Sequence, residues 1–292
     1  MNTFKFTLLI LLTTFLMGSS FAVVKFGLPY SSPLLLAALR FTLAGLIMAV
    51  IVFILKRPHP TSIKNWMKMF TIGAFQTAGV MGCIFLSLRT ITASESSILT
   101  FTNPLLVVVL STIFLKTKYR LYQWVGVLFG LVGVSITMGA QIDFKIGILY
   151  GILSAVFWAI ATLLANKWGI HFDTWVLSAY QMLFGGLLLL LSSFMFEKSF
   201  FILNSHSLLI LLWLSIMSSI VQFAVWYYLL QKGDPGRTSA YLFLAPFFGV
   251  ISGWLLLGEP LYPSIIVGGM FIIIGIYLVN SNFQKKTVEN KI

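Results

Sequence analysis

The sequence predicts an all-α integral membrane protein, in which ten transmembrane helices form two inverted repeats of five. The first observation behind this fold class is composition. Of the 292 residues, 59% are hydrophobic and 9% are charged, whereas a soluble domain has about 25% charged residues. The second is a duplication, because residues 92–134 align without a gap with residues 234–276, and Pro104 falls on Pro246. A duplicated apolar chain is typical of a secondary transporter, whose related halves rock around one midplane site.

Apolar runs recur along the whole chain, and each is about 18–23 residues long, which is enough to cross a bilayer as a helix. No long polar segment is left between them for a soluble domain. The predicted spans are, in chain order, Phe6–Val24, Leu34–Ile54, Met69–Ser87, Ala93–Phe114, Tyr122–Ala140, Gly147–Asn166, Trp175–Phe196, Leu208–Leu230, Thr238–Leu257 and Tyr262–Asn280.

The spans divide into two repeats, which we expect at residues 1–141 and 142–282, followed by a cytoplasmic tail at residues 283–292. The aligned glycines Gly126 and Gly268 lie in the last span of each repeat. Because each repeat has an odd number of spans, the second enters the bilayer from the side opposite to the first. The repeats are therefore inverted.

Lysines and arginines indicate the orientation. The formal net charge of +12 would suit a nucleic-acid partner, but these residues lie in short loops between apolar spans, which is the pattern of the positive-inside rule. Fourteen lie on the side of the N-terminus, and four, namely Lys25, Arg89, Lys145 and Lys198, lie on the other. We therefore expect both termini to be cytoplasmic, in a multi-pass protein of the cytoplasmic membrane that contacts lipid and binds no nucleic acid.

Several motifs occur in a fixed order along the chain. They are MGSSFAVVK, AALRFTLAG, ILTFTNPLLVVVLS with its mate YLFLAPFFGVISGWLLLGEP, and the glycine-rich pair GVLFGLVGV and GGMFIIIGI. Together they resemble the EamA family of the drug/metabolite transporter superfamily, over nearly the whole chain and as two tandem copies. The resemblance implies a ten-helix inverted-repeat exporter of small metabolites such as amino acids, nucleobases, vitamins or drugs.

This sequence departs from a symmetric pair of copies at two charged positions. Arg40 in the second span has Gln181 as its mate, and Glu259 after the second proline helix has Thr117. A charge shared by both halves in an ancestor is therefore present here in one half only.

Polar and aromatic side chains within the predicted spans are the candidate substrate site, because a polar side chain facing lipid lacks partners and tends to face the bundle or a wet cavity. The candidate substrate-binding residues are Gln76, Asn103, Trp158, Gln222, Trp226 and Tyr241. We expect Gln76, Asn103, Trp158 and Gln222 to meet near the midplane. The alternative is that such residues only form hydrogen bonds between helices, worth about 0.6–2 kcal/mol each.

Four further residues have either a hinge or a structural interpretation. Pro104 and Pro246 are expected in mid-helix, where a missing N–H frees an upstream carbonyl and makes either a hinge or a static kink. Arg40 either extends to the outer interface or faces the cavity and attracts a carboxylate. Glu259 marks a helix C-terminus after a glycine, and it is also placed to pair with Lys25 as an external latch.

No motif indicates catalysis. His59, His171 and His206 lie in separate loops, without the helical spacing of a metal site, and there is no nucleotide-binding glycine loop. We expect neither an enzyme nor a bound cofactor or metal. The predicted function is export of a small amphipathic metabolite, such as an amino acid, a related compound or a drug, by a monomer that works by alternating access. The alternative is a non-transporting membrane subunit or assembly factor of another complex.

Overall fold

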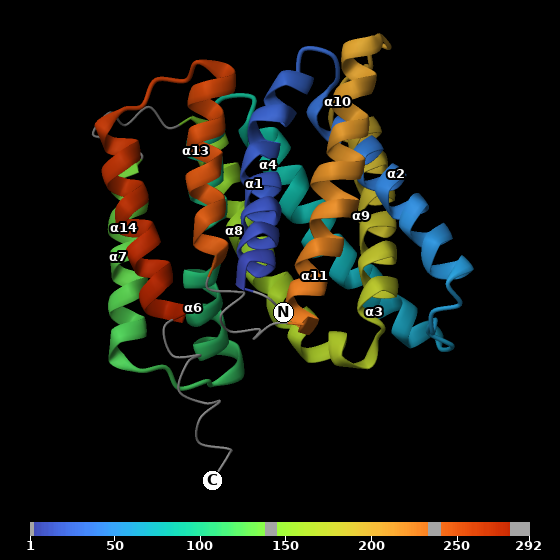
Figure 1. Cartoon of the computed structure of the whole chain (residues 1–292), viewed down its shortest axis with the longest axis horizontal. Helices are drawn as coiled ribbons and strands as arrows, with labels where there is room; N and C mark the ends of the chain where they lie inside the picture. Colours follow the sequence, from blue (N-terminus) through green and yellow to red (C-terminus); the bar gives the residue numbers. More distant parts are fainter. Residues whose placement is uncertain (1–2, 138–144, 233–240, 281–292) are drawn as a thin grey trace.

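The computed structural model describes residues 3–137, 145–232 and 241–280, and these residues are almost entirely helical (Figure 1). The elements, in chain order, are α1 (Thr3–Gly27), α2 (Pro33–Ile54), α3 (Ile63–Gly73), η1 (Ala74–Gly79), α4 (Val80–Ser87), α5 (Ala93–Thr100), α6 (Asn103–Leu115), α7 (Leu121–Thr137), α8 (Ile146–Trp168), η2 (Gly169–His171), α9 (Thr174–Phe196), α10 (Ser205–Ser215), η3 (Ile216–Val221), α11 (Gln222–Lys232), η4 (Tyr241–Phe243), α13 (Leu244–Leu257) and α14 (Pro263–Asn280).

Each predicted span overlaps a helical stretch in the described part of the chain, which confirms the all-α class for those residues. Among the described residues, seven helical stretches are apolar and long enough to cross a membrane, and three shorter apolar helices correspond to α7, α13 and α14. The expected junction between the repeats and the expected tail at residues 283–292 lie outside the described residues.

The two prolines do not lie in mid-helix, and that expectation is wrong. The fourth predicted span is two helices, because α5 ends at Thr100 and α6 begins at Asn103, with Pro104 in the first turn of α6. Pro246 is likewise in the first turn of α13, which follows the short helix η4. A helix start tolerates proline because its first N–H groups have no partner within the helix.

Helices from the two halves of the sequence pack closely against each other. In Figure 1, α7 and α14 lie side by side at one edge of the bundle. A Cβ on Gly275 would lie 2.5 Å from the carbonyl oxygen of Gly126, and a Cβ on Gly133 would lie 2.6 Å from that of Gly268. Only glycine permits this approach of the two backbones. The contacts run in opposite order along the two helices, so α7 and α14 are antiparallel.

The same arrangement recurs between α2 and α9. A Cβ on Gly45 would meet the backbone nitrogen of Leu183 at 2.5 Å, and one on Gly186 would meet that of Thr42, also at 2.5 Å. The main hydrophobic core lies beside this pair, where α1, α2, α4 and α9 bury side chains that include Phe21, Phe41, Phe85 and Met182.

Two long helices contain a π-helical turn at equivalent positions of the aligned halves. The segment η1 lies between α3 and α4, and η3 lies between α10 and α11. Such insertions are rare and are often found at functional sites, because they release a backbone carbonyl from the regular hydrogen-bond pattern.

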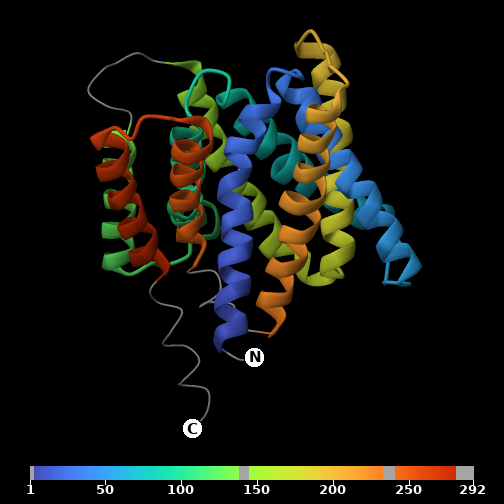
Figure 2. The same ribbon diagram turned by 45° about the horizontal axis from the view of Figure 1, so that its top comes forward.

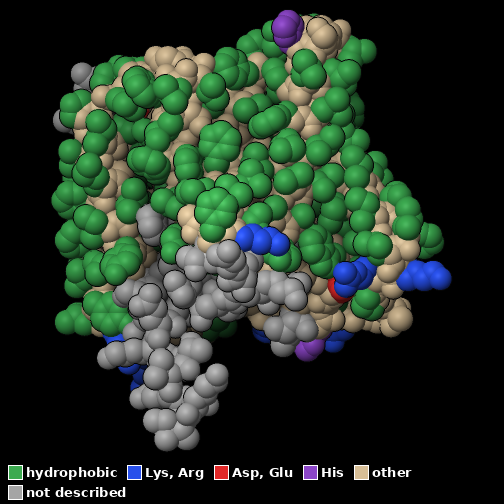
Figure 3. All heavy atoms as spheres, viewed as in Figure 1, with side chains coloured by type: hydrophobic (Ala, Val, Ile, Leu, Met, Phe, Trp, Pro, Cys, Tyr) green, Lys and Arg blue, Asp and Glu red, His purple; other side chains and the backbone are tan. Residues whose placement is uncertain are grey.

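The surface of the bundle is mostly hydrophobic. On the face shown in Figure 3, hydrophobic side chains cover the upper part, and lysine and arginine gather towards the lower part. Figures 1 and 2 show that α1 begins and α14 ends at this lower end of the bundle. Large side chains such as Phe53 and Phe196 are about three-quarters exposed, at 74% and 77%. A contiguous apolar surface of this kind is suited to lipid and not to water.

Candidate functional site

Arg40 is the central residue of the candidate site. It lies on α2, and only 3% of it is exposed. Its Nε donates a hydrogen bond to Ser219 Oγ at 3.0 Å, and its Nη2 donates to the carbonyl oxygen of Ser218 at 2.7 Å. The Ser219 hydroxyl donates in turn to the carbonyl of Leu214 at 2.9 Å. The guanidinium is therefore held in one orientation by two bonds to η3.

The π turn of η3 explains why Ser218 can accept this bond. In an α-helix the amide of Gln222 would donate to the carbonyl of Ser218. Here that amide donates to the carbonyls of Met217 and Ser219 instead, which leaves Ser218 without its α-helical donor. The Arg40 guanidinium therefore satisfies a carbonyl that the π turn has released.

Arg40 has no carboxylate partner in the described part of the chain. The ion pairs found there are Lys25 with Glu259 and Arg57 with Asp173. Arginine keeps its charge in proteins, and a buried charge without a counter-ion is costly. An ionisable residue within a membrane span is therefore a functional residue by default.

Arg40 lines a small cavity with polar side chains from the other half of the sequence. Ser218 and Gln222 line it, and the Ser218 hydroxyl is fully buried, with no partner among the described residues. Five aromatic side chains form much of its wall, namely Phe21, Phe85, Phe101, Trp158 and Phe223. About 40 Å³ is open to the centres of water-sized molecules, which is room for about three waters. This space is smaller than a metabolite needs.

The cavity includes some of the sequence-predicted residues and leaves out others. Trp158 and Gln222 line it, and so does Arg40, whose interpretation as a cavity residue therefore agrees with the geometry. The predicted residues that are not among its lining residues are Gln76, Asn103, Trp226 and Tyr241. The four residues expected to meet at the midplane are thus not brought together in this cavity.

Local geometry accounts for two of these exclusions. In η1 it is Thr77, next to Gln76, that faces the bundle, and its hydroxyl donates to Gln181 Oε1 at 2.9 Å. Successive helical side chains point about 100° apart, so Gln76 points elsewhere. Tyr241 packs edge-on against Phe6, with 5.9 Å between the ring centroids, which places it at the start of α1.

The Thr77–Gln181 bond is the counterpart of the Arg40–Ser219 bond. In the sequence alignment of the halves, Gln181 falls on Arg40 and Ser219 falls on Thr77. The first half contributes Arg40 to one bond and the Thr77 hydroxyl of η1 to the other. The second half contributes the partners, which are the Ser219 hydroxyl of η3 and Gln181. The two bonds differ in charge, because one uses a guanidinium and the other a neutral amide.

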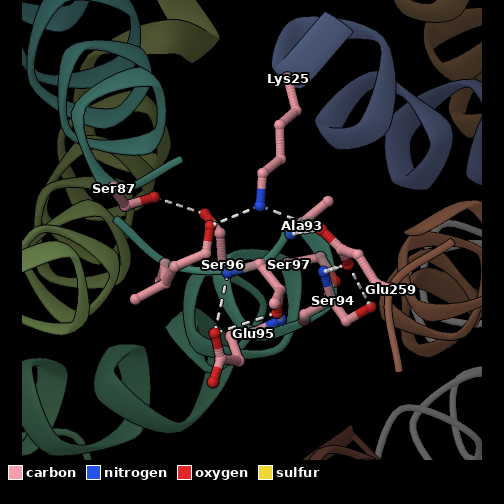
Figure 4. Close-up of polar contacts among 10 residues, drawn as sticks. Lys25, Ser87, Ala93, Ser94, Glu95, Ser96, Ser97 and Glu259 are labelled. Carbon is pink, nitrogen blue, oxygen red and sulfur yellow. Dashed lines mark hydrogen bonds and ion pairs between the residues drawn. The ribbon is translucent and has the colours of Figure 1, made fainter. Parts of the chain in front are cut away.

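A second polar cluster joins the ends of three elements (Figure 4). Glu259, which is 7% exposed, accepts hydrogen bonds from the amides of Ala93 and Ser94, at 2.7 and 3.1 Å, and from the Ser94 hydroxyl at 2.9 Å. Lys25 Nζ lies 3.1 Å from Glu259 Oε1 and donates to the carbonyl of Ile91 at 2.9 Å. The carboxylate thus caps the N-terminus of α5, and the pairing with Lys25 considered from the sequence is present.

The aromatic walls and the π turns are features that sequence reasoning missed. Phe21 and Phe101 are ordinary phenylalanines of apolar spans, and no sequence signal distinguishes a cavity wall from a core. The serines of η3 carried a partial signal, because Ser218, Ser219 and Gln222 share one face of a predicted helix.

The model of the family described as the "EamA-like transporter family" matches the chain twice, at residues 5–139 and 145–281. The chain belongs to this family. It is therefore a transporter and a multi-pass membrane protein, in agreement with its long apolar helices.

Curated relatives match this EamA-like transporter over nearly its whole length. The "Uncharacterized transporter YoaV" of Bacillus subtilis is 25% identical over 97% of this chain and 99% of its own. The "WAT1-related protein At3g02690, chloroplastic" of Arabidopsis thaliana is 28% identical over 91% of this chain and 67% of its own length. The "Probable amino-acid metabolite efflux pump" of Salmonella typhimurium is 24% identical over 92% of this chain and 93% of its own length. A crystal structure that is 21% identical covers 96% of this chain and 99% of its own with a TM-score of 0.67, which shows the same fold.

Proposed function

We propose that this transporter exports a small amphipathic metabolite, such as an amino acid, a related compound or a drug, across the cytoplasmic membrane by alternating access. The observation that carries the proposal is the cavity at the contact between the halves. Arg40 and Phe85 come from the first half, and Trp158, Ser218 and Gln222 come from the second. A site shared by two halves opens to one side or the other when the halves move relative to each other.

The proposed architecture is ten helices in two inverted repeats, at residues 1–141 and 142–282. A two-fold axis between repeats requires that each contact recurs with the partners exchanged. The alignment pairs Gly126 with Gly268, and Gly133 with Gly275. The contact of Gly126 with Gly275 therefore recurs, with the halves exchanged, as the contact of Gly268 with Gly133. Antiparallel packing of α7 against its mate α14 supports inversion.

The proposed orientation places both termini in the cytoplasm. It rests on the fourteen-to-four distribution of lysine and arginine, and the gathering of these residues near the end where α1 begins is consistent with it (Figure 3). The cluster around Lys25 and Glu259 would then lie at the outer side. In this arrangement the ion pair ties α1 to the chain after α13 and holds the outer side closed.

Counterflow in liposomes tests the proposal. The purified chain is reconstituted into vesicles loaded with one unlabelled metabolite at a time, from a panel of amino acids, related compounds and drugs, and uptake of the same labelled compound is followed against protein-free vesicles. We expect transient accumulation for at least one member of the panel. If a well-folded protein gives no counterflow with any of them, a non-transporting membrane subunit becomes the better interpretation.

A further inference from the structure

We infer that the transported compound carries a carboxylate, that Arg40 binds it, and that this transporter prefers small organic anions with an apolar or aromatic body. The inference rests on the proposed transport function and adds the charge of the substrate to it. Three observations carry it, and they concern the charge of the cavity, the donors in the cavity and the counterpart of Arg40 in the other half.

The charge of the cavity is positive. Arg40 is the lining residue that carries a charge, and no acidic side chain of the described residues is among those that line the cavity. The guanidinium has five N–H donors, and the bonds to Ser219 and Ser218 use two of them. The planar arrangement of guanidinium donors matches the two oxygens of a carboxylate. A cationic ligand would instead be repelled at this short range.

Further donors lie beside the guanidinium. The Ser218 hydroxyl is fully buried and lines the cavity, with no hydrogen-bond partner among the described residues. Buried hydroxyls are normally hydrogen-bonded, so this one is available to donate to a ligand in the cavity. Gln222 lines the cavity one helical turn further along and supplies an amide. A carboxylate accepts from all three side chains, whereas the apolar wall of Phe85, Phe101 and Trp158 is suited to the rest of the molecule.

The counterpart of Arg40 shows that holding the π turn does not require a charge. In the other half the neutral amide of Gln181 makes the equivalent bond, to the Thr77 hydroxyl, and Gln181 is as buried as Arg40, at 4% against 3% exposed. A glutamine is therefore sufficient for packing a helix against a π turn. The positive charge of Arg40 adds a cost that packing does not explain, and an anionic ligand would offset it.

The test compares ligands that differ in charge and share a body. Phenylacetate, phenylacetamide and phenethylamine form one set, and butyrate, butyramide and butylamine form another. Affinities are measured on the purified full chain in detergent by calorimetry and by ligand-induced change in melting temperature. A hydrogen-bonded charge pair is worth about tenfold or more in affinity, so each carboxylate should bind at least about tenfold more tightly than its amide, and the amines should bind most weakly.

Two variants separate binding from packing. Arg40→Gln installs the residue that the other half already uses, so it should fold and should abolish the preference for carboxylate over amide. Gln181→Met is the matched control, because it breaks the bond to Thr77 outside the cavity. This control should lower the melting temperature and keep the carboxylate preference.

Several results would overturn the inference. These are equal or tighter binding of amide or amine by the wild-type chain, no binding of any carboxylate at millimolar concentration, and an undiminished preference in Arg40→Gln. If Arg40→Gln does not fold, the wild-type comparison alone decides. Counterflow of neutral or cationic compounds without a carboxylate preference would refute the inference and leave transport standing. Carboxylate binding without counterflow of any compound would refute transport and leave the site standing.

Discussion

Lys25 Nζ of α1 lies 3.1 Å from Glu259 Oε1, beyond the end of α13, so one ion pair joins elements from opposite halves of the sequence. The aligned position in the other half cannot form such a pair, because Thr117 stands where Glu259 stands here. The pair is therefore a one-sided contact. In the proposed orientation, this ion pair favours the state in which the outer side is closed.

Breaking this pair should open the outer side more often. Lys25→Met removes the charge and leaves the hydrogen bonds from Ala93 and Ser94 to Glu259 in place. The Lys25 side chain is 29% exposed, so the pair is worth about 0.2–1 kcal/mol, and the open fraction should rise up to about fivefold. A cysteine at Met81, which lines the cavity, should react correspondingly faster with an impermeant thiol reagent in intact cells that carry Cys83→Ala.

The ion pair between Arg57 and Asp173 offers a matched control for the latch. The Arg57 side chain is 44% exposed, and its Nη1 lies 3.5 Å from Asp173 Oδ2. Arg57→Met should leave the labelling rate of the cavity cysteine unchanged. An unchanged rate in Lys25→Met as well would show that the latch does not control access.

The orientation predicts opposite accessibility for two engineered cysteines. Lys198→Cys follows α9 in an outer loop of the proposed topology, and Gln284→Cys lies in the proposed cytoplasmic tail. In cells whose native Cys83 has been replaced by alanine, an impermeant reagent should label the first site and should reach the second only after lysis. Labelling of the second site in intact cells would reverse the topology.

The close contact of α7 and α14 should be intolerant of even one added methyl group. A Cβ at Gly275 would lie 2.5 Å from the carbonyl oxygen of Gly126, so Gly275→Ala forces the helices apart and should cost about 1–3 kcal/mol. Gly269→Ala on the same helix is the control, because its Cβ would meet Ile98 Cδ1 at an ordinary 3.5 Å. Melting temperatures in detergent should fall for the first variant only, and equal melting of both would contradict the assigned contact.

The positions of the prolines predict a mild effect from replacing them. Pro104 and Pro246 lie in the first turns of α6 and α13, where their missing N–H groups cost little. Alanine at both sites should lower stability by about 0.4–1 kcal/mol for each site, through the greater freedom of the unfolded chain. Counterflow of the substrate found in the panel should continue near the wild-type rate. A severe loss of transport at unchanged melting temperature would show that the prolines themselves are hinges.

These prolines also show what could and could not be predicted from the sequence. Hydropathy located the helices because a chain that crosses a bilayer must satisfy its backbone within apolar segments. It could not show that the helix before Pro104 stops at Thr100, since a proline is equally compatible with a kink and with a helix start. The end of a helix within an apolar run depends on packing, not on hydropathy.

Part of the candidate site could likewise be predicted from the sequence, and part could not. Gln222 and Trp158 were identifiable because polar and amphipathic side chains are uncommon within apolar spans. The partner of Arg40 was not, because its bond to Ser219 depends on how α2 meets the π turn of η3. The turn arises from one extra residue in a helical pattern, and Ala74–Gly79 and Ile216–Val221 share no motif that would indicate it.

Gln222 and Trp158 line the cavity, whereas Gln76 is not among its lining residues, so substitutions at these positions should differ in their effect on ligand affinity. Gln222→Leu keeps the side-chain volume roughly and removes the amide, and the lost hydrogen bond to a charged ligand group should lower affinity about tenfold. Gln76→Leu makes the same chemical change outside the cavity and should leave affinity unchanged.

Trp158→Ala should lower the affinity for phenylacetate more than the affinity for butyrate, because it removes part of the aromatic wall. Affinity and melting temperature measured on one detergent preparation separate binding from packing, and a loss of stability alone would make these residues part of the helix contacts and not of the site.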